Sequence, residues 1–253
     1  MTTFTRLENL NGKTAVITGA AGQIGYATAI RLAQQGCRII GIVRSKLGEA
    51  EEKFSDLPNP ELGHQIIVAD VTNTASLVSA RDKISRCDIL INCAGITKNI
   101  FPENTTELTD DIFDDILITN VRGTWACIRT FLPLLKATGD GLVINLSSTS
   151  GERSGRGNVA YAASKGGVNL ITKTLSRVLA PQGVRVLAVA PGFLEGSTSG
   201  VNKAPEITVK QAAQVPLGRI AYGDDIASTI EALCTHIRYA NGSIILVDGG
   251  RTV

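Results

Sequence analysis

The sequence predicts an α/β fold: a single doubly wound domain in which a seven-stranded parallel sheet carries helices on both faces. Short apolar runs alternate with helical patterns along the whole chain. These runs are continuously rather than alternately hydrophobic, which is typical of strands buried on both faces of a parallel sheet. The segments between them are long enough to supply the helices that parallel crossovers require.

Seven apolar runs mark the expected strands, and six helical patterns lie between them. In chain order the runs are KTAVIT (13–18), CRIIGIV (37–43), HQIIVA (64–69), CDILIN (87–92), GLVINL (141–146), VRVLAVA (184–190) and SIILVDG (243–249). The helices are expected at 23–35, 46–55, 73–84, 109–136, 159–180 and 224–236. Asn73 and Thr109 are suitable N-cap residues for two helices, and Pro181 closes the fifth.

The length of the chain favours one domain over residues 1–253, because α/β folds often reach this size undivided. We find no internal repeat and no interdomain linker. The longest irregular stretch is 193–216, FLEGSTSGVNKAPEITVKQAAQVP. Because long loops in compact domains are usually functional, we expect a substrate lid there, with a decorated surface loop as the alternative.

The composition is that of an ordinary globular protein, with 43% hydrophobic and 19% charged residues. A net charge of +2 is too balanced to indicate a surface for nucleic acid or membrane. No apolar run reaches the roughly 18 residues of a membrane span, and no signal-peptide pattern begins the chain, so we expect a cytoplasmic protein.

Five scattered cysteines lie in apolar sequence, and their number is odd. This pattern favours buried, reduced thiols rather than disulfides. The two histidines, His64 and His236, lie near no cluster of cysteines or carboxylates. We therefore expect no metal site.

The stretch TGAAGQIG, residues 18–25, follows the first apolar run and opens the first helix. A strand, a glycine-rich turn and a helix N-terminus can cradle pyrophosphate on free backbone N–H groups. Because short glycine motifs give many false matches, a tight turn without a ligand is an equal alternative at this point.

Other motifs lie at the ends of later strands. YAASK occupies 161–165, and Ser148 stands thirteen residues before Tyr161. NCAG (92–95), TNVRG (119–123), APG (190–192) and VDGG (247–250) complete the set. Together they resemble the short-chain dehydrogenase/reductase family over essentially the whole chain. CAGIT, YAASKGGV, VRVLAVAPGF and VPLGR are most similar to its 3-oxoacyl-acyl-carrier-protein reductase branch, and the resemblance implies a Rossmann-type fold.

The spacing within YAASK has a chemical reason. Residues four apart share a helix face, so the Lys165 ammonium can approach the Tyr161 phenol. A cation within about 4–6 Å lowers the pKa of a phenol, which would make Tyr161 a usable acid and base. Ser148 could hold the substrate oxygen by a hydrogen bond. Ser147 is its nearest competitor, and the thirteen-residue offset favours Ser148. The resemblance also implies that Lys165 binds the nicotinamide ribose and that Asn120 supports a water.

The glycine turn departs from the family pattern of glycine, three residues, glycine, one residue, glycine. Gln23 stands where the middle glycine belongs, and Gly22 moves the flexible position one residue earlier. The result is similar to the turns of longer sugar-nucleotide epimerases and dehydratases and of malate dehydrogenases. We still expect pyrophosphate binding, through Gly19, Gly22, Gln23, Ile24 and Gly25.

The end of the second strand indicates which dinucleotide is bound. An acidic residue there would accept the adenosine ribose hydroxyls of NAD, but Val43 occupies that position. Arg44 and Ser45, with Lys46 after them, suit the extra phosphate of NADP. The basic residue that often precedes the middle glycine in NADP-using relatives is missing, because that place is Gly22. We expect NADP, with NAD possible and a solvent-facing Arg44 as the alternative.

The resemblance assigns the remaining cofactor contacts. Asp70 and Val71 are expected at the adenine, Asn92, Ala94 and Gly95 along the ribose, and Pro191, Gly192 and Leu194 behind the nicotinamide. A threonine is common at position 196, where this chain has Gly196, so Ser197 or Thr198 is expected to substitute.

These observations predict an NADP-dependent oxidoreductase that acts on a secondary alcohol or ketone. Lys98, Arg153 and Arg156 would favour an anionic carbonyl substrate such as a 3-oxoacyl thioester, although NIFPENTTEL departs from the segment common in acyl-carrier-protein reductases. A nucleotide-retaining epimerase or dehydratase and a non-catalytic dinucleotide sensor are the alternatives. Apolar surface on the two longest helices, including Trp125, Phe131 and Leu134, together with the resemblance, suggests a homotetramer or a dimer.

Overall fold

The seven strands form one parallel sheet in the computed structural model, which describes residues 7–45, 47–153, 157–196 and 205–253. The strand order is β3-β2-β1-β4-β5-β6-β7, and every neighbouring pair is parallel. The predicted sheet is therefore confirmed. The strands are β1 (Thr14–Thr18), β2 (Arg38–Val43), β3 (Gln65–Val68), β4 (Ile89–Asn92), β5 (Gly141–Leu146), β6 (Val184–Pro191) and β7 (Ile244–Val247).

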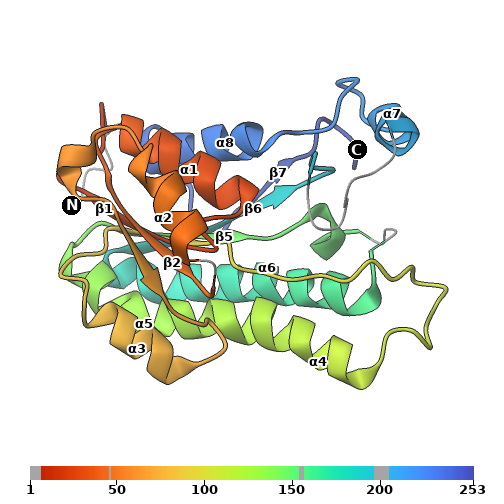
Figure 1. Cartoon of the computed structure of the whole chain (residues 1–253), viewed down its shortest axis with the longest axis horizontal. Coiled ribbons are helices and arrows are strands. Elements are labelled where there is room, and N and C mark those ends of the chain that lie inside the picture. The colour runs from red at the N-terminus through yellow and green to blue at the C-terminus, as the bar shows by residue number, and fades with distance from the viewer. Residues whose placement is uncertain (1–6, 46, 154–156, 197–204) are drawn as a thin grey trace.

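Helices cover both faces of this sheet, as the sequence predicts. On one side lie α1 (Gln23–Gln34), α2 (Leu47–Ser55) and α8 (Gly223–Thr235). On the other lie α3 (Thr74–Arg81), α4 (Asp110–Leu117), α5 (Gly123–Ala137) and α6 (Val159–Leu179). Figure 1 shows the two helix layers with the sheet between them. A further helix, α7 (Pro205–Ala212), stands apart from both layers.

Each face of the sheet has its own hydrophobic core. Ile17 of β1 packs on the side of α1 and α8 with residues such as Ile230. The next residue back, Val16, packs on the opposite side with Phe131 of α5. This alternation follows from the period of two in a strand, and it explains why both neighbours must be apolar.

The burial of Phe131 corrects one expectation. Its side chain is fully buried, so it adds nothing to an exposed apolar face. Leu134 is half-buried against the same core. Trp125, on the same helix, does reach the surface, with 41% of its area exposed. Sequence pattern alone did not separate the residues that α5 turns to the sheet from those it turns outward.

Two other elements differ from the expected ones. The helix predicted over 109–136 changes to π geometry at Ile118–Arg122 before α5 begins. Such π segments are rare and frequently mark functional sites. The stretch at 193–216, expected to be irregular, contains α7. The helical pattern of α7 is short and lies in a segment rich in glycine and proline, so the sequence alone did not indicate a helix there.

Four of the five cysteines are buried and Cys93 is half-buried; all five are free thiols. Within the described ranges, no helix combines the length and apolarity needed to cross a bilayer. The same residues hold no cluster of three or more metal-binding side chains of the His, Cys, Asp and Glu types.

Candidate active site

The predicted site residues gather where the strands end. Parallel strands present their carboxyl ends at one edge of the sheet, and the register aligns these ends closely. Thr18, which ends β1, pairs with Asn92 of β4, and Asn92 pairs with Asn145 of β5. The glycine turn, the NCAG segment and Ser148 therefore lie side by side at this edge, which is where open parallel sheets bind ligands.

Helix α6 brings Tyr161 and Lys165 to the same edge. The helix begins at its cap Asn158, whose Oδ1 accepts a hydrogen bond of 2.7 Å from the Tyr161 backbone N–H. The Lys165 Nζ lies 5.6 Å from the centroid of the Tyr161 ring. It donates a 2.6 Å hydrogen bond to the carbonyl of Leu146, the last residue of β5. The ammonium is thus fixed between the strand end and the phenol.

The pKa values of this pair differ from the expectation. Burial raises the pKa of Tyr161, and its hydrogen bond with Ser148 lowers it by less. Burial also lowers the pKa of Lys165, to about 8. The predicted lowering of the phenol pKa is therefore wrong for this structure. Helical spacing places the cation nearby, but burial of the phenol sets the direction of its pKa shift.

The two adjacent serines face in different directions. Ser148 hydrogen-bonds to Tyr161, and its Oγ also accepts from the Ser150 backbone N–H at 3.2 Å. Ser147 is buried and donates to Asn169 of α6 at 2.5 Å. Only Ser148 therefore faces the phenol, and its catalytic role stays a prediction.

Asn120 lies in the π segment and is completely buried. Its Oδ1 accepts from the Ile96 N–H at 2.8 Å, and its Nδ2 donates to the Ile96 carbonyl at 2.9 Å. The Nδ2 also donates to Ser164 Oγ at 3.0 Å. The side chain therefore joins the segment after β4 to α6, and its role in holding a water stays a prediction.

The glycine turn has the features of an anion cradle. Gly19 adopts φ +65°, and a Cβ added at Gly25 would lie 2.4 Å from the Gly19 carbonyl oxygen. Helix α1 has no side-chain cap. Within the part of the chain that the structure describes, the backbone N–H groups of Gln23, Ile24 and Gly25 meet no acceptor. Such free donors at a helix N-terminus fit a pyrophosphate.

Gln23, which departs from the family pattern, does not block this cradle. Its Cγ lies 3.0 Å from where a Cβ of Gly223 would stand, and its Nε2 lies 3.8 Å from the same position at Gly196. The side chain thus lies beside the start of α8. Sequence could not show this, because the space depends on Gly223, two hundred residues along the chain.

The end of β2 is open to solvent. Val43 is buried, whereas Arg44 and Ser45 are exposed. Among the described residues, the Arg44 guanidinium makes no hydrogen bond or ion pair. Gly19 of the turn donates a 2.9 Å hydrogen bond to the carbonyl of Ile42, which places Arg44 next to the turn.

The residues expected to contact the adenine and ribose lie along the same edge, but not all of them point their side chains toward it. Asp70 uses Oδ1 to accept from the Thr72 N–H and hydroxyl, both at 2.8 Å. Val71 is buried. Asn92 turns its side chain inward to donate to Asn145 Oδ1 at 2.8 Å, so only its backbone can line a ribose path.

Ala94 and Gly95 follow β4 at the centre of the edge. The Ala94 N–H donates to Thr18 Oγ1 at 3.1 Å, a link that the motifs did not indicate. A Cβ added at Gly95 would lie 3.1 Å from Asn120 Oδ1 and 3.8 Å from Lys165 Nζ. Gly95 thus borders the predicted catalytic residues directly.

The expected nicotinamide side is built by the end of β6 and the segment after it. Pro191 is buried, the Gly192 N–H donates to the Val247 carbonyl at 3.0 Å, and Leu194 pairs with Ala221 in an isolated β-bridge. Sequence reasoning missed Arg251, whose guanidinium carbon lies 3.8 Å from the centroid of the Phe193 ring. No local signal links these two residues.

At the expected substrate mouth, Lys98 and Arg153 are exposed. Asn158 Nδ2 donates to the Lys98 carbonyl at 2.7 Å, which ties this segment to α6. An Asn three residues before Tyr161 could have been identified as a helix cap. Arg156, Ser197 and Thr198 lie outside the described residues.

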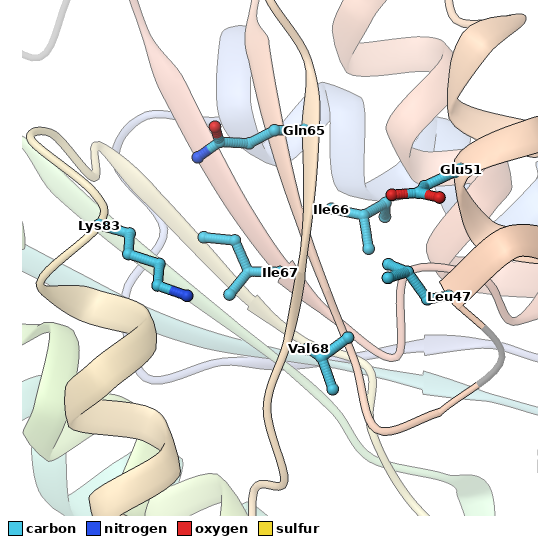
Figure 2. Close-up of a pocket in the computed structure, with 7 residues that line it drawn as sticks. All are labelled: Leu47, Glu51, Gln65, Ile66, Ile67, Val68 and Lys83. Carbon is cyan, nitrogen blue, oxygen red and sulfur yellow. The ribbon is translucent and has the colours of Figure 1, made fainter.

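A groove of about 360 Å³ lies away from all these residues, at the outer edge of the sheet. Figure 2 shows Lys83 on one side of strand β3 and Leu47 with Glu51 on the other. The groove follows β3, the edge strand that pairs with β2 on one side only, and its lining contains none of the predicted catalytic or cofactor residues. Its lining is Leu47, Glu51, Gln65, Ile66, Ile67, Val68 and Lys83.

Comparison with known proteins supplies independent evidence. A family model described as enoyl-(acyl carrier protein) reductase matches residues 19–252. A 3-oxoacyl-[acyl-carrier-protein] reductase of Thermotoga maritima is 32% identical over 249 residues, 96% of this chain and 99% of that protein.

Solved structures agree with this match. A 3-ketoacyl-(acyl-carrier-protein) reductase of Brucella melitensis complexed with NADH has a TM-score of 0.88 at 30% identity, and the match covers 97% of this chain and all of the other. A gluconate 5-dehydrogenase of Burkholderia cenocepacia in complex with NADP and tartrate also has a TM-score of 0.88, at 25% identity and 96% coverage of both chains.

Proposed function

The chain belongs to the short-chain dehydrogenase/reductase family of NAD(P)-dependent oxidoreductases, and we propose that it transfers hydride between NADP and a secondary alcohol or ketone. The placement of Tyr161, Ser148 and Lys165 together, beside a turn that can take pyrophosphate, carries this proposal. The family match does not favour a nucleotide-retaining epimerase or dehydratase, or a dinucleotide sensor.

The residues of this chain perform the proton transfer in the proposed mechanism. Bound NADPH supplies the hydride. Ser148 donates a hydrogen bond to the carbonyl oxygen and holds the carbonyl carbon in position. As the carbon–oxygen π pair moves to oxygen, Tyr161 donates its phenolic proton there. Because burial raises the pKa of Tyr161, the phenol is protonated at neutral pH and ready for reduction.

Arg44 supports NADP as the preferred cofactor. It is exposed at the end of β2, next to the glycine turn, and no carboxylate stands at Val43 to accept ribose hydroxyls. A charge-assisted hydrogen bond to a phosphate contributes roughly 1.5–3 kcal/mol, enough for about a tenfold to hundredfold preference. NAD remains the weaker alternative.

For the substrate, we propose an anionic carbonyl compound such as a 3-oxoacyl thioester. Lys98 and Arg153 are both exposed near the catalytic edge and give it positive charge. The names of two relatives, 3-oxoacyl- and 3-ketoacyl-acyl-carrier-protein reductase, support this class. Residues 193–216, which begin directly after Pro191 and Gly192, are proposed to close over the substrate, within a single domain of residues 1–253.

We also propose that the protein works in the cytoplasm as a homotetramer, with a dimer as the alternative. Five free thiols support a reducing compartment. Trp125, Leu170 and Val178 expose apolar area on the outer helices, which supports contact with further copies of the chain. Light scattering at micromolar concentration would measure the mass, and a monomer would contradict this assembly.

The Tyr161→Phe variant tests the proposed function. A panel of neutral and carboxylated ketones is followed by NADPH absorbance, and the variant should lose about 10²–10⁴-fold in reduction rate because the proton donor is gone. NADPH binding, measured by its fluorescence, should remain and would show that the site is intact. Reduction by the variant at the parent rate would contradict the mechanism.

A further inference from the structure

The missing basic residue of the glycine turn has a counterpart in α2. Lys53 reaches back from this helix and donates a 3.1 Å hydrogen bond from Nζ to the carbonyl of Ala21, in the middle of the turn. The turn residue that precedes Gln23 is Gly22 and carries no charge. A cation therefore stands at the turn, although the sequence of the turn itself contains none.

Packing places this cation next to the end of β2. Phe54, the residue after Lys53, lies against Gly41 together with Ala20 of the turn: a Cβ added at Gly41 would lie 2.5 Å from Phe54 Cζ and 2.9 Å from Ala20 Cβ. Both Gly19 and Ala20 donate to the Ile42 carbonyl, at 2.9 and 3.4 Å. Arg44 follows Ile42 by two residues. Arg44 and Lys53 are therefore both next to the glycine turn.

The Lys53 ammonium retains capacity for an anion. An ammonium has three N–H donors, and Ala21 takes one of them. Glu49 Oε1 lies 3.7 Å from Nζ, an ion pair beyond hydrogen-bond distance, with side chains 37% and 51% exposed. Surface pairs four residues apart on a helix are weak, so a phosphate can compete for this ammonium. The Nζ also lies 5.9 Å from the centroid of the Tyr26 ring, which helps to hold the side chain at the turn.

We propose that Lys53 is a second specificity-determining residue for NADP and that it binds the 2′-phosphate of the adenosine ribose together with Arg44. This proposal rests on the proposed function, which puts the dinucleotide in the turn. In this class of site the ribose binds at the end of β2, and Arg44 and Lys53 are both next to the glycine turn there. Arg44 offers a planar fork and Lys53 a point charge, and the two together suit a phosphomonoester dianion.

Direct binding measurements separate this role from a structural one. Dissociation constants for NADPH and NADH are measured by nicotinamide fluorescence in the parent, Lys53→Met, Arg44→Met and the double variant. Methionine keeps the aliphatic stem beside Tyr26 and removes the charge. We expect Lys53→Met to weaken NADPH about tenfold, the size of one charge-assisted contact, and to change NADH less than about twofold. Lys136→Met, on exposed α5 surface at the opposite edge of the sheet, is the matched control and should change neither.

Two outcomes would overturn the proposal. Equal weakening of NADPH and NADH would mean that Lys53 only shapes the turn through the Ala21 carbonyl. An unchanged NADPH constant would mean that the ammonium does not meet the phosphate. Neither measurement involves turnover, so a failure of Lys53 is distinguishable from a failure of the proposed carbonyl reduction, which appears only in the ketone panel. Displacement of NADPH by 2′,5′-ADP, weakened in Lys53→Met, provides a second reading of the same contact.

Discussion

Tyr161 and Lys165 show how burial decides the chemistry of a single residue. At the end of β5 the Lys165 side chain is buried and that of Tyr161 is half-buried, and each charged form is penalised: the phenol pKa rises and the ammonium pKa falls to about 8. Between neutrality and pH 8 the pair is therefore a neutral phenol beside an ammonium. This is the protonation state that carbonyl reduction requires.

The Lys165 pKa predicts a pH dependence. The ammonium is charged below its pKa of about 8 and neutral above it, so kcat/KM for NADPH-dependent reduction should fall as pH rises through that value. Lys165→Arg keeps a charge at all these pH values. When kcat/KM is measured from pH 6 to 10, the decrease near pH 8 should be absent in this variant, whatever its absolute activity. If Lys165→Arg kept the decrease in kcat/KM near pH 8, the decrease would belong to the titration of another group.

The two adjacent serines give a matched pair of variants. Ser148→Ala removes the hydroxyl that faces Tyr161, and kcat should fall about 10²–10³-fold, as for the loss of other donors to a developing oxyanion. Ser147→Ala instead leaves the buried Asn169 Oδ1 without its 2.5 Å donor. It should cost about 1–3 kcal/mol of unfolding free energy with little loss of kcat. Comparable losses of kcat in both variants would refute the division of roles.

At the scale of elements, α6 is the support of the catalytic residues, and Asn158 fixes its start. This side chain is 1% exposed, caps the helix through Tyr161 N–H and holds the Lys98 carbonyl at 2.7 Å. The helix and the segment after β4 are thereby joined at the substrate mouth. Asn158 is a positioning residue, because it acts through Tyr161.

We expect Asn158→Ala to lower the free energy of unfolding by about 1–2 kcal/mol through the lost cap. Because the first turn of α6 carries Tyr161, kcat should fall as well, about tenfold for a displacement of the proton donor. Asn73→Ala removes the equivalent cap of α3, where Oδ1 accepts from Ser76 N–H at 3.0 Å. This control should lose similar stability and keep its kcat. A loss of kcat in proportion to stability in both variants would show that Asn158 has no special position.

The sequence predicts the elements that have a periodic pattern, and it misses features that depend on contacts between residues far apart in the chain. The seven strands follow from their apolar runs, and YAASK with Ser148 predicts the residues that meet at the sheet edge. No local sequence pattern marks the π segment, and its Asn120 contacts Ile96 and Ser164, which are distant in sequence. The predicted direction of the Tyr161 pKa shift was wrong because residue spacing indicates which charges are close but not how far the phenol is buried. The position of Gln23 depends on Gly223 in the same way.

At the scale of the whole molecule, the two edges of the sheet differ in what they do. At the carboxyl edge, in the described part of the chain, the backbone N–H groups of residues 23–25 and the Arg44 guanidinium meet no acceptor. The opposite edge pairs its charges: Asp88, 1% exposed, accepts from the Thr14 N–H at 2.9 Å and from Arg86 at 2.7 and 2.8 Å, with Lys13 at 3.3 Å. Arg238 also pairs there with Asp140. Stability and chemistry are therefore supported by separate sets of charges.

Asp88 predicts how stability depends on pH. Burial alone would raise its pKa, but the hydrogen bonds from Arg86 and Thr14 and the charge of Lys13 lower it. A lowered folded-state pKa means that the carboxylate stabilises the fold above the unfolded value of about 4, and that this contribution is lost as pH falls through the folded-state pKa. Asp88→Asn should therefore lower the free energy of unfolding at pH 7 by about 1–3 kcal/mol.

Urea unfolding of parent and variant at pH 7, 5, 4 and 3 measures this dependence. The difference between them should shrink below pH 4, because protonation removes from the parent the charge that the variant already lacks. Asp82 forms a surface ion pair with Arg81, and the Asp82 side chain is 59% exposed. The unfolding free energy of Asp82→Asn should therefore stay close to that of the parent at every pH. A difference for Asp88→Asn that is constant from pH 7 to pH 3 would mean that packing, and not charge, joins the starts of β1 and β4.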